Sequence, residues 1–202
     1  MTNDPTVVAL TGWLDYDRDS LGALTDEQRI DYFEKRVHLV VINPLRRILK
    51  TEIMVEGSSA ILIFGVALCS AIEATGKFLG GNNLKHADRF DHFVKTYMSR
   101  SLDQELTPGV TYRDVLRTHF RNGLAHGFSV CHGGFQGGIG EPYFIVEQVA
   151  GHPCLEINPT CLLEDFESGF ARYLSGVKQA AATEEIRKNF LDVFARVFIN
   201  GE

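Results

Sequence analysis

Apolar residues recur at helical spacing along most of the chain. The first such run, with steps of three or four positions, consists of Ile30, Phe33, Val37, Val41, Leu45 and Ile48. This spacing predicts an amphipathic helix. Thr25 and Gln28, just before the run, have the spacing of a capping box and predict where the helix begins. Pro44 predicts a kink or a restart of the helix, with Asn43 as a new cap.

The same period predicts further helices along the chain. A central apolar helix is expected over 58–79, ending at the Gly-Gly-Asn-Asn of 80–83. Asp88 is expected to open another helix, and Thr-Pro-Gly at 107–109 predicts a turn. Helical spacing returns over 161–177 and 184–199, with Thr183 as the cap of the second segment. The inner face of the helix after Asp88 is predicted to consist of Phe90, Phe93, Val94 and Tyr97.

Between these helices the pattern changes to short runs with a period of two. Residues 132–142 are rich in glycine and predict a loop, whereas 143–149 and 154–158 predict two strands of a β-hairpin. The fold predicted is therefore all-α: an up-and-down helical bundle of about five to six helices with one inserted β-hairpin. We expect a single domain over 1–202, with an N-terminal arm at 1–24 and the insertion at 128–159.

Composition limits the classes of function. The chain is 45% hydrophobic and 23% charged, which is typical of a globular protein with a sizeable core. Its net charge of −6 argues against a general electrostatic attraction to nucleic acid, so any such contact requires a local basic patch. The four cysteines suggest no disulfide framework and the N-terminus is not a signal peptide, so a cytoplasmic location is expected. Residues 58–72 are uncharged but too short to cross a bilayer, and a buried helix rather than a membrane span is expected.

One predicted helix carries an unusual number of polar groups. Thr111 and Asp114 have the spacing of a capping box, and Gly127 is a natural stop. The buried stripe is predicted to consist of Leu116, Phe120 and Leu124. On an α-helix with about 100° per residue, two polar stripes flank it. They consist of His119, Asn122 and His126 on one side and Arg113, Arg117 and Arg121 on the other.

The segment Arg121-Asn122-x-x-x-His126 resembles the Rx4–6H signature of the HEPN superfamily. The resemblance extends to a long first helix, an apolar second helix with an embedded acid, the motif on a late helix, and closing helices. It implies a bundle of four to five helices and a metal-independent endoribonuclease, of the kind found in toxin–antitoxin or phage-defence systems. It also implies a homodimer in which both motifs form one site, an RNA substrate, and an antitoxin as a protein partner, with no cofactor.

The residue types suit this chemistry in their own right. Cleavage of RNA through its 2′-hydroxyl requires one proton to be removed and another to be supplied, and histidine transfers protons near neutral pH. Arginine stabilises the negative charge that develops on the phosphorus centre. Arg121 and His126 lie about 140° apart around an α-helix, which a two-fold dimer would reconcile. The plain alternative is that Arg121 forms a salt bridge and His126 stabilises the end of its own helix.

Several other residues are candidates for the same site. Glu73 interrupts the apolar central helix and requires a partner if it is buried. The resemblance suggests that it faces the motif helix and positions Arg121, whereas the alternative is a surface pair with Lys77. His119, Arg113 and Arg117 are candidates for RNA binding, although a packing histidine and a solvated basic face are the ordinary alternatives.

No metal site is predicted, because the spacing of the cysteines and histidines between 131 and 161 matches no zinc motif. A second class of function remains open: a non-catalytic HEPN-like module that binds a nucleotide, RNA or a partner protein with the same fold and dimer.

Overall fold

The computed structural model describes residues 18–51, 60–123, 133–137, 140–149 and 152–201. Its N-terminal half contains α2 (Arg18–Gly22), α3 (Asp26–Val37), η1 (His38–Ile42), α4 (Asn43–Thr51), α5 (Ala60–Gly80), α6 (His86–Tyr97) and η2 (Arg100–Asp103). Then follow β1 (Glu105–Thr107), β2 (Val110–Thr111), α7 (Tyr112–Val115), η3 (Leu116–Arg121), β3 (Gly133–Phe135), β4 (Phe144–Val149), β5 (His152–Ile157), α9 (Pro159–Gln179), α10 (Glu185–Phe194) and η4 (Ala195–Asn200).

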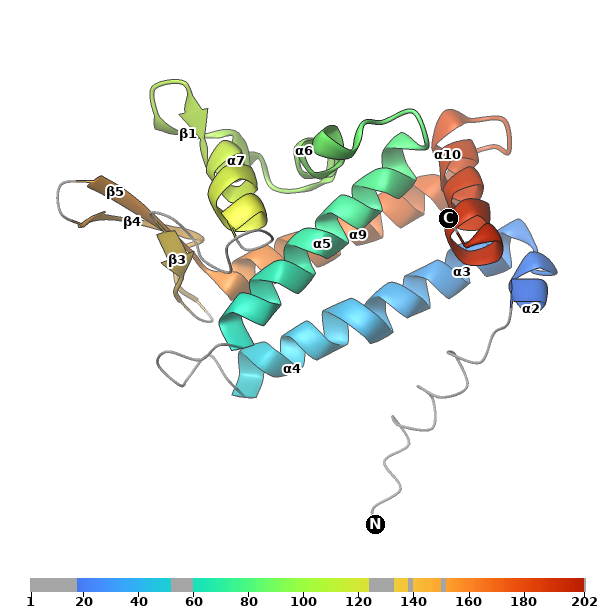
Figure 1. Ribbon diagram of the computed structural model, residues 1–202, viewed down its shortest axis with the longest axis horizontal. Coiled ribbons are helices and arrows are strands. Elements are labelled where there is room, and N and C mark those ends of the chain that lie inside the picture. Colours follow the sequence, from blue (N-terminus) through green and yellow to red (C-terminus); the bar gives the residue numbers. More distant parts are fainter. Residues whose placement is uncertain (1–17, 52–59, 124–132, 138–139, 150–151, 202) are drawn as a thin grey trace, which may run out of the picture.

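The molecule is a mainly helical bundle, as predicted. The continuous helix α3–η1–α4 packs against α5 and α9, and α10 lies at one end of the bundle (Figure 1). Phe33, Phe78 and Phe190 bring α3, α5 and α10 together, with ring centroids 4.2 to 5.5 Å apart. The central helix α5 is long and apolar enough to cross a membrane by length and composition, but half of its most apolar window is buried inside the protein.

Both predicted capping boxes are present. Thr25 accepts a hydrogen bond from the backbone N–H of Gln28, whose side chain accepts one from the N–H of Thr25. Thr111 and Asp114 make the same reciprocal pair at the start of α7. The bonds of Thr111 to the carboxylate lower the pKa of Asp114, which favours its charged form at this helix start.

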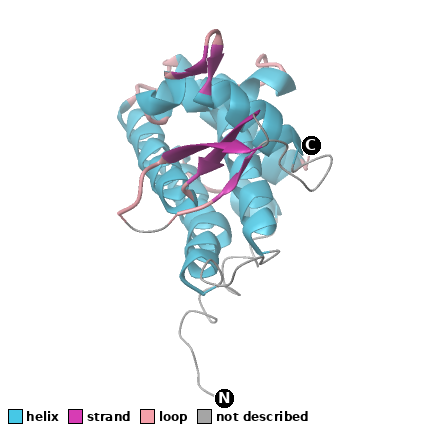
Figure 2. Ribbon diagram, turned by 90° about the vertical axis from the view of Figure 1, so that its left-hand side faces the viewer, coloured by secondary structure: helices cyan, strands magenta, loops and turns pink. Residues whose placement is uncertain are grey.

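The β-structure corrects the prediction of one inserted hairpin. β1 and β2 form a small antiparallel hairpin around the predicted 107–109 turn, and β3, β5 and β4 form a three-stranded sheet (Figure 2). The hairpin β4–β5 is where it was predicted, but β3 pairs with β5 in parallel inside the segment that was predicted to be a loop. Glycine makes this possible: a Cβ on Gly133 would lie 2.5 Å from the carbonyl oxygen of Leu155.

Three predicted helix boundaries were wrong. Asn43 is not a cap but lies in helical conformation, and its N–H donates to His38 five residues earlier. The π-helical segment η1 lets the chain pass Pro44 without a restart, since it repositions the carbonyls that a proline ring would contact. Helix α6 begins at His86 rather than Asp88, and α10 is capped by Glu184 rather than Thr183. Of the predicted arm, residues 1–17 lie outside the described part, and α2 packs on η4.

Helix α6 packs very closely on α5. A Cβ added to Gly76 would lie 2.0 Å from the backbone carbonyl oxygen of Arg89, so only glycine fits at this crossing. The predicted inner face of α6 is confirmed, since Phe90, Phe93 and Val94 are buried and Tyr97 is partly buried. This crossing determines where the first turn of α6 lies relative to α5.

A buried arginine on the late helix α10 pairs with a carboxylate on the early helix α3. Arg187 on α10 is 9% exposed, and its Nη2 donates to Oε1 of Glu27 on α3 at 2.6 Å. Hydrogen bonding to Arg187 lowers the pKa of Glu27. The carboxylate itself is 72% exposed, so the pair lies at the surface with only the arginine buried.

Candidate functional site

The helix that carries the motif changes its hydrogen bonding just before the motif begins. α7 is α-helical, but η3 is π-helical, and the N–H of Asn122 donates to the carbonyl of Arg117, five residues earlier. Leu116 and Phe120 are fully buried, as predicted, and η3 packs on α5. Phe120 and Phe64 both contact Phe135 of β3, which attaches the three-stranded sheet to this region.

Arg121 is held by Glu73. Nε and Nη2 of Arg121 both donate to Oε2 of Glu73, at 2.9 and 2.6 Å, and Nη1 donates to Oδ1 of Asn122 at 2.7 Å. The side chains of Glu73 and Arg121 are 15% and 20% exposed. The pairing of Glu73 with the motif helix is therefore present, and the predicted alternative, a surface pair with Lys77, is not the contact that the carboxylate makes. The guanidinium retains further N–H groups on both Nη atoms for another acceptor.

A second side chain contacts the same carboxylate. Nε2 of His86, the first residue of α6, lies 2.8 Å from Oε1 of Glu73. One carboxylate thus joins side chains from α6 and η3 to the central helix α5. We call Glu73, His86, Arg121 and Asn122 the Glu73 cluster. His86 was not found from the sequence, because its partner is remote in the chain and the residue follows no periodic pattern.

The predicted basic stripe is not a free basic surface. Nη1 of Arg117 lies 2.8 Å from Oδ2 of Asp91 on α6, and Arg113 forms an ion pair with Asp103. Each arginine of the stripe has a carboxylate partner on a different element. His119, on the same helix, is partly buried. The stripe therefore has a structural use in joining the motif helix to its neighbours.

The proposed proton-transfer residue lies beyond the described part of the motif helix. His126 belongs to the undescribed segment 124–132, together with Leu124, Gly127 and two of the residues considered for zinc. Among the described residues, no group of three or more His, Cys, Asp and Glu is arranged to hold a metal ion. Of the predicted catalytic residues, Arg121, Asn122 and Glu73 are brought together.

A thiol lies just beneath the cluster but is not a nucleophile. Cys69 is one turn before Glu73 on α5 and is 2% exposed. Burial raises the pKa of its thiol to about 12, with Arg121 lowering it and Glu73 raising it further. A thiol that stays protonated is unreactive, so the chemistry of this region rests on the imidazole, guanidinium, carboxylate and amide groups.

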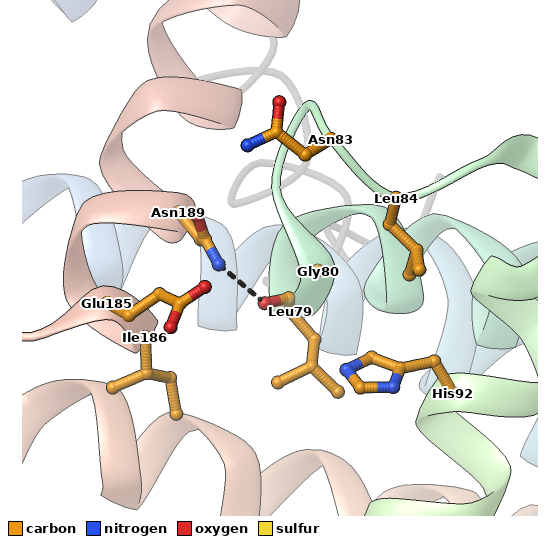
Figure 3. A pocket seen from close by; sticks show the side chains of 8 residues that line it. All are labelled: Leu79, Gly80, Asn83, Leu84, His92, Glu185, Ile186 and Asn189. Carbon is orange, nitrogen blue, oxygen red and sulfur yellow. Dashed lines mark hydrogen bonds between the residues drawn. The ribbon is translucent and has the colours of Figure 1, made fainter.

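A separate cavity lies at the C-terminal end of α5. It has a volume of about 550 Å³ and lies between the end of α5, α6 and the start of α10 (Figure 3). Leu79, Leu84 and Ile186 supply apolar lining. Asn189 donates to the carbonyl of Leu79 at 3.1 Å, which anchors this end of α5. The cavity is lined by none of the residues of the Glu73 cluster, so the two features are distinct.

Comparison with models of protein families, with curated proteins and with solved structures found no match. The chemistry of the Glu73 cluster therefore has to be argued from its own geometry.

Proposed function

We propose that this chain is a metal-independent endoribonuclease of HEPN type, acting as a homodimer. The observation that supports this most is the two-point hydrogen bonding of Arg121 to Glu73 on the central helix. A guanidinium fixed in this way is oriented before the substrate arrives, and electrostatic stabilisation by pre-oriented groups is the largest contribution to many enzymatic rates. The sequence context, Arg-Asn-x-x-x-His, agrees with this interpretation.

In the proposed reaction the 2′-hydroxyl of RNA attacks the adjacent phosphorus. The P–O5′ bond breaks, and the products are a 2′,3′-cyclic phosphate and a 5′-hydroxyl. Arg121 binds the non-bridging oxygens through its remaining N–H groups, and Asn122 keeps the guanidinium plane in place from its other side. His126 transfers the proton of the attacking hydroxyl. No step requires a metal ion.

The proposal is tested with purified protein and single-stranded RNA in the presence of EDTA. Cleavage with a 2′,3′-cyclic phosphate end is expected, whereas DNA of the same sequence should resist because it lacks the nucleophile. Arg121→Ala and His126→Ala should each lose on the order of 10²- to 10⁴-fold in rate. Circular dichroism provides the folding control, and Lys77→Ala, a change on α5 outside the Glu73 cluster, serves as the matched variant. Equal cleavage by wild type and well-folded His126→Ala would assign the activity to a contaminant.

One observation favours a second candidate function. The pairing of Arg113 with Asp103 and of Arg117 with Asp91 removes free positive charge from the motif helix, and the chain is acidic overall. A non-catalytic HEPN-like module that binds a nucleotide or a protein partner would need no basic track. Binding of a labelled nucleotide by a protein that does not cleave RNA would support this second function, whereas RNA binding that weakens steeply with salt would contradict the absence of a basic track.

A further inference from the structure

His86 and Arg121 contact the two oxygens of one carboxylate, that of Glu73. Nε2 of His86 contacts Oε1 of Glu73, while Oε2 of the same carboxylate accepts both bonds from Arg121. The imidazole and the guanidinium are therefore neighbours across a single carboxylate. A phosphodiester held by Arg121 would lie within the immediate surroundings of His86.

The side chain of His86 can be reached by a substrate, and one of its two ring nitrogens is not engaged by Glu73. The side chain is 68% exposed, compared with 15% for Glu73 and 20% for Arg121. The carboxylate is thus the inner member of the cluster and the imidazole the outer one. With Nε2 held by Glu73, the other ring nitrogen, Nδ1, remains for a substrate group. A carboxylate that holds one nitrogen of a histidine fixes the ring so that the other can exchange a proton.

Cleavage of RNA needs two proton-transfer groups in different places. The attacking 2′-oxygen and the leaving 5′-oxygen lie on opposite sides of the phosphorus in an in-line displacement. One group accepts the proton of the 2′-hydroxyl, and another supplies a proton to the 5′-oxygen as the P–O5′ bond breaks. A single imidazole on the motif helix serves one of these oxygens at a time.

We propose that His86 is the general acid of this site, an inference that rests on the proposed ribonuclease function. The imidazolium of His86 donates the proton on Nδ1 to the leaving 5′-oxygen, while its Nε2–H stays bonded to Glu73. The electron pair of the P–O5′ bond passes to that oxygen, and His86 becomes neutral. The 2′-hydroxyl proton goes to a general base, the role that the proposed function gives to His126, and exchange with water returns both groups to their starting states. Glu73 is the positioning residue for both His86 and Arg121.

The test compares two substrates that differ in their leaving group. In uridyl-3′,5′-adenosine the leaving group is the 5′-oxygen of adenosine, a strongly basic alkoxide that needs a proton. In uridine 3′-(4-nitrophenyl phosphate) the leaving group is 4-nitrophenolate, a stabilised anion that does not. His86→Ala should lose about 10²- to 10³-fold in kcat on the dinucleotide and should keep wild-type kcat on the aryl ester. His86→Gln should behave in the same way, because its amide can still donate to Glu73 but cannot transfer a proton. Retention of the dinucleotide rate by either well-folded variant would overturn the proposal.

Two controls separate the possible failures. His92→Ala changes another histidine of α6, one that lines the separate cavity (Figure 3), and should leave both rates unchanged. A wild-type protein inactive on RNA and on both small substrates would refute the proposed function itself. Cleavage by wild type with an equal loss on both substrates in His86→Ala would leave the function standing and overturn the assignment of His86 as the acid.

Discussion

Two arginine–carboxylate pairs in this molecule use the same chemical groups in opposite ways. In the Arg187–Glu27 pair the arginine is the buried member and the carboxylate is 72% exposed, so the pair acts as a clamp between α10 and α3. In the Arg121–Glu73 pair the carboxylate is the inner member, at 15% exposure, and it holds a second group, His86. A partly buried carboxylate requires compensating partners. Here one inner carboxylate holds two side chains, the guanidinium of Arg121 at 20% exposure and the imidazole of His86 at 68%, and together they form the proposed site.

The largest difference between the two pairs should appear in activity. Arg121→Met keeps an unbranched side chain but removes the charge, and we expect the rate of RNA cleavage to fall by about 10²- to 10³-fold. Arg187→Met makes the same change at the clamp and should leave the rate per folded molecule unchanged. Both are measured on one RNA substrate, with the folded fraction taken from circular dichroism. A comparable loss in Arg187→Met would remove the functional distinction between the pairs.

The second prediction concerns the helix crossing that brings His86 to Glu73. Gly76→Ala would place a Cβ 2.0 Å from the carbonyl oxygen of Arg89, so α6 must move away from α5. We expect a loss of about 3 kcal/mol in the free energy of unfolding, measured in urea. Gly134→Ala in β3, where an added Cβ would meet nothing within 4 Å, is the control and should be close to neutral. A tolerated Gly76→Ala would mean that the crossing does not determine the position of α6.

A third prediction compares the two carboxylates directly. Glu73→Gln keeps the shape but replaces the charge that Arg121 and His86 share, and it should cost about 1 to 2 kcal/mol of stability. Glu27→Gln removes an exposed carboxylate and should change stability much less at neutral pH. Thermal and urea denaturation measure both. A cost for Glu73→Gln no greater than that for Glu27→Gln would indicate that Glu73 is merely a surface residue.

The smallest effect is a pH dependence confined to the clamp. Arg187 lowers the pKa of Glu27 below its ordinary value of 4.5, through a side-chain hydrogen bond first and charge attraction second. Because the folded-state pKa is the lower one, this contribution is complete above pH 4.5 and is lost as the pH falls through the lowered value. The small stability difference between wild type and Glu27→Gln should therefore disappear in acid. A difference that grows as the pH falls would contradict this sign.

The local signals in the sequence were sufficient for most helices. The capping boxes at Thr25 and Thr111 act within four residues, and the apolar period of 3.6 predicts which faces are buried, as Leu116 and Phe120 confirm. Strands β1 to β3 were missed because each has two or three residues, too few for an alternating pattern. The parallel pairing of β3 with β5 depends on a contact between distant segments that a glycine run does not signal.

The candidate site was only partly predictable for the same reason. An acid within an apolar helix indicated that Glu73 needs a partner, and the motif named Arg121. The second partner, His86, could not be identified, because it depends on how closely α6 approaches α5 at Gly76. A count of the hydrogen-bond capacity of a carboxylate would have shown that one arginine does not exhaust it, and this would have directed attention to a further donor.

The π-helical segment η3 gives the motif helix one extra residue of chain length. A π-helical turn holds one residue more than an α-helical turn over the same hydrogen-bonded span. Deleting the exposed Thr118 would let the N–H of Asn122 bond to the same carbonyl of Arg117 with ordinary α-helical spacing, so that Asn122 would keep its direction. A deletion in α7, where the bonding is already α-helical, would instead rotate Arg121 by about 100° around the axis. The two length variants therefore compare a motif that still faces Glu73 with one that does not, without substituting any residue of the cluster.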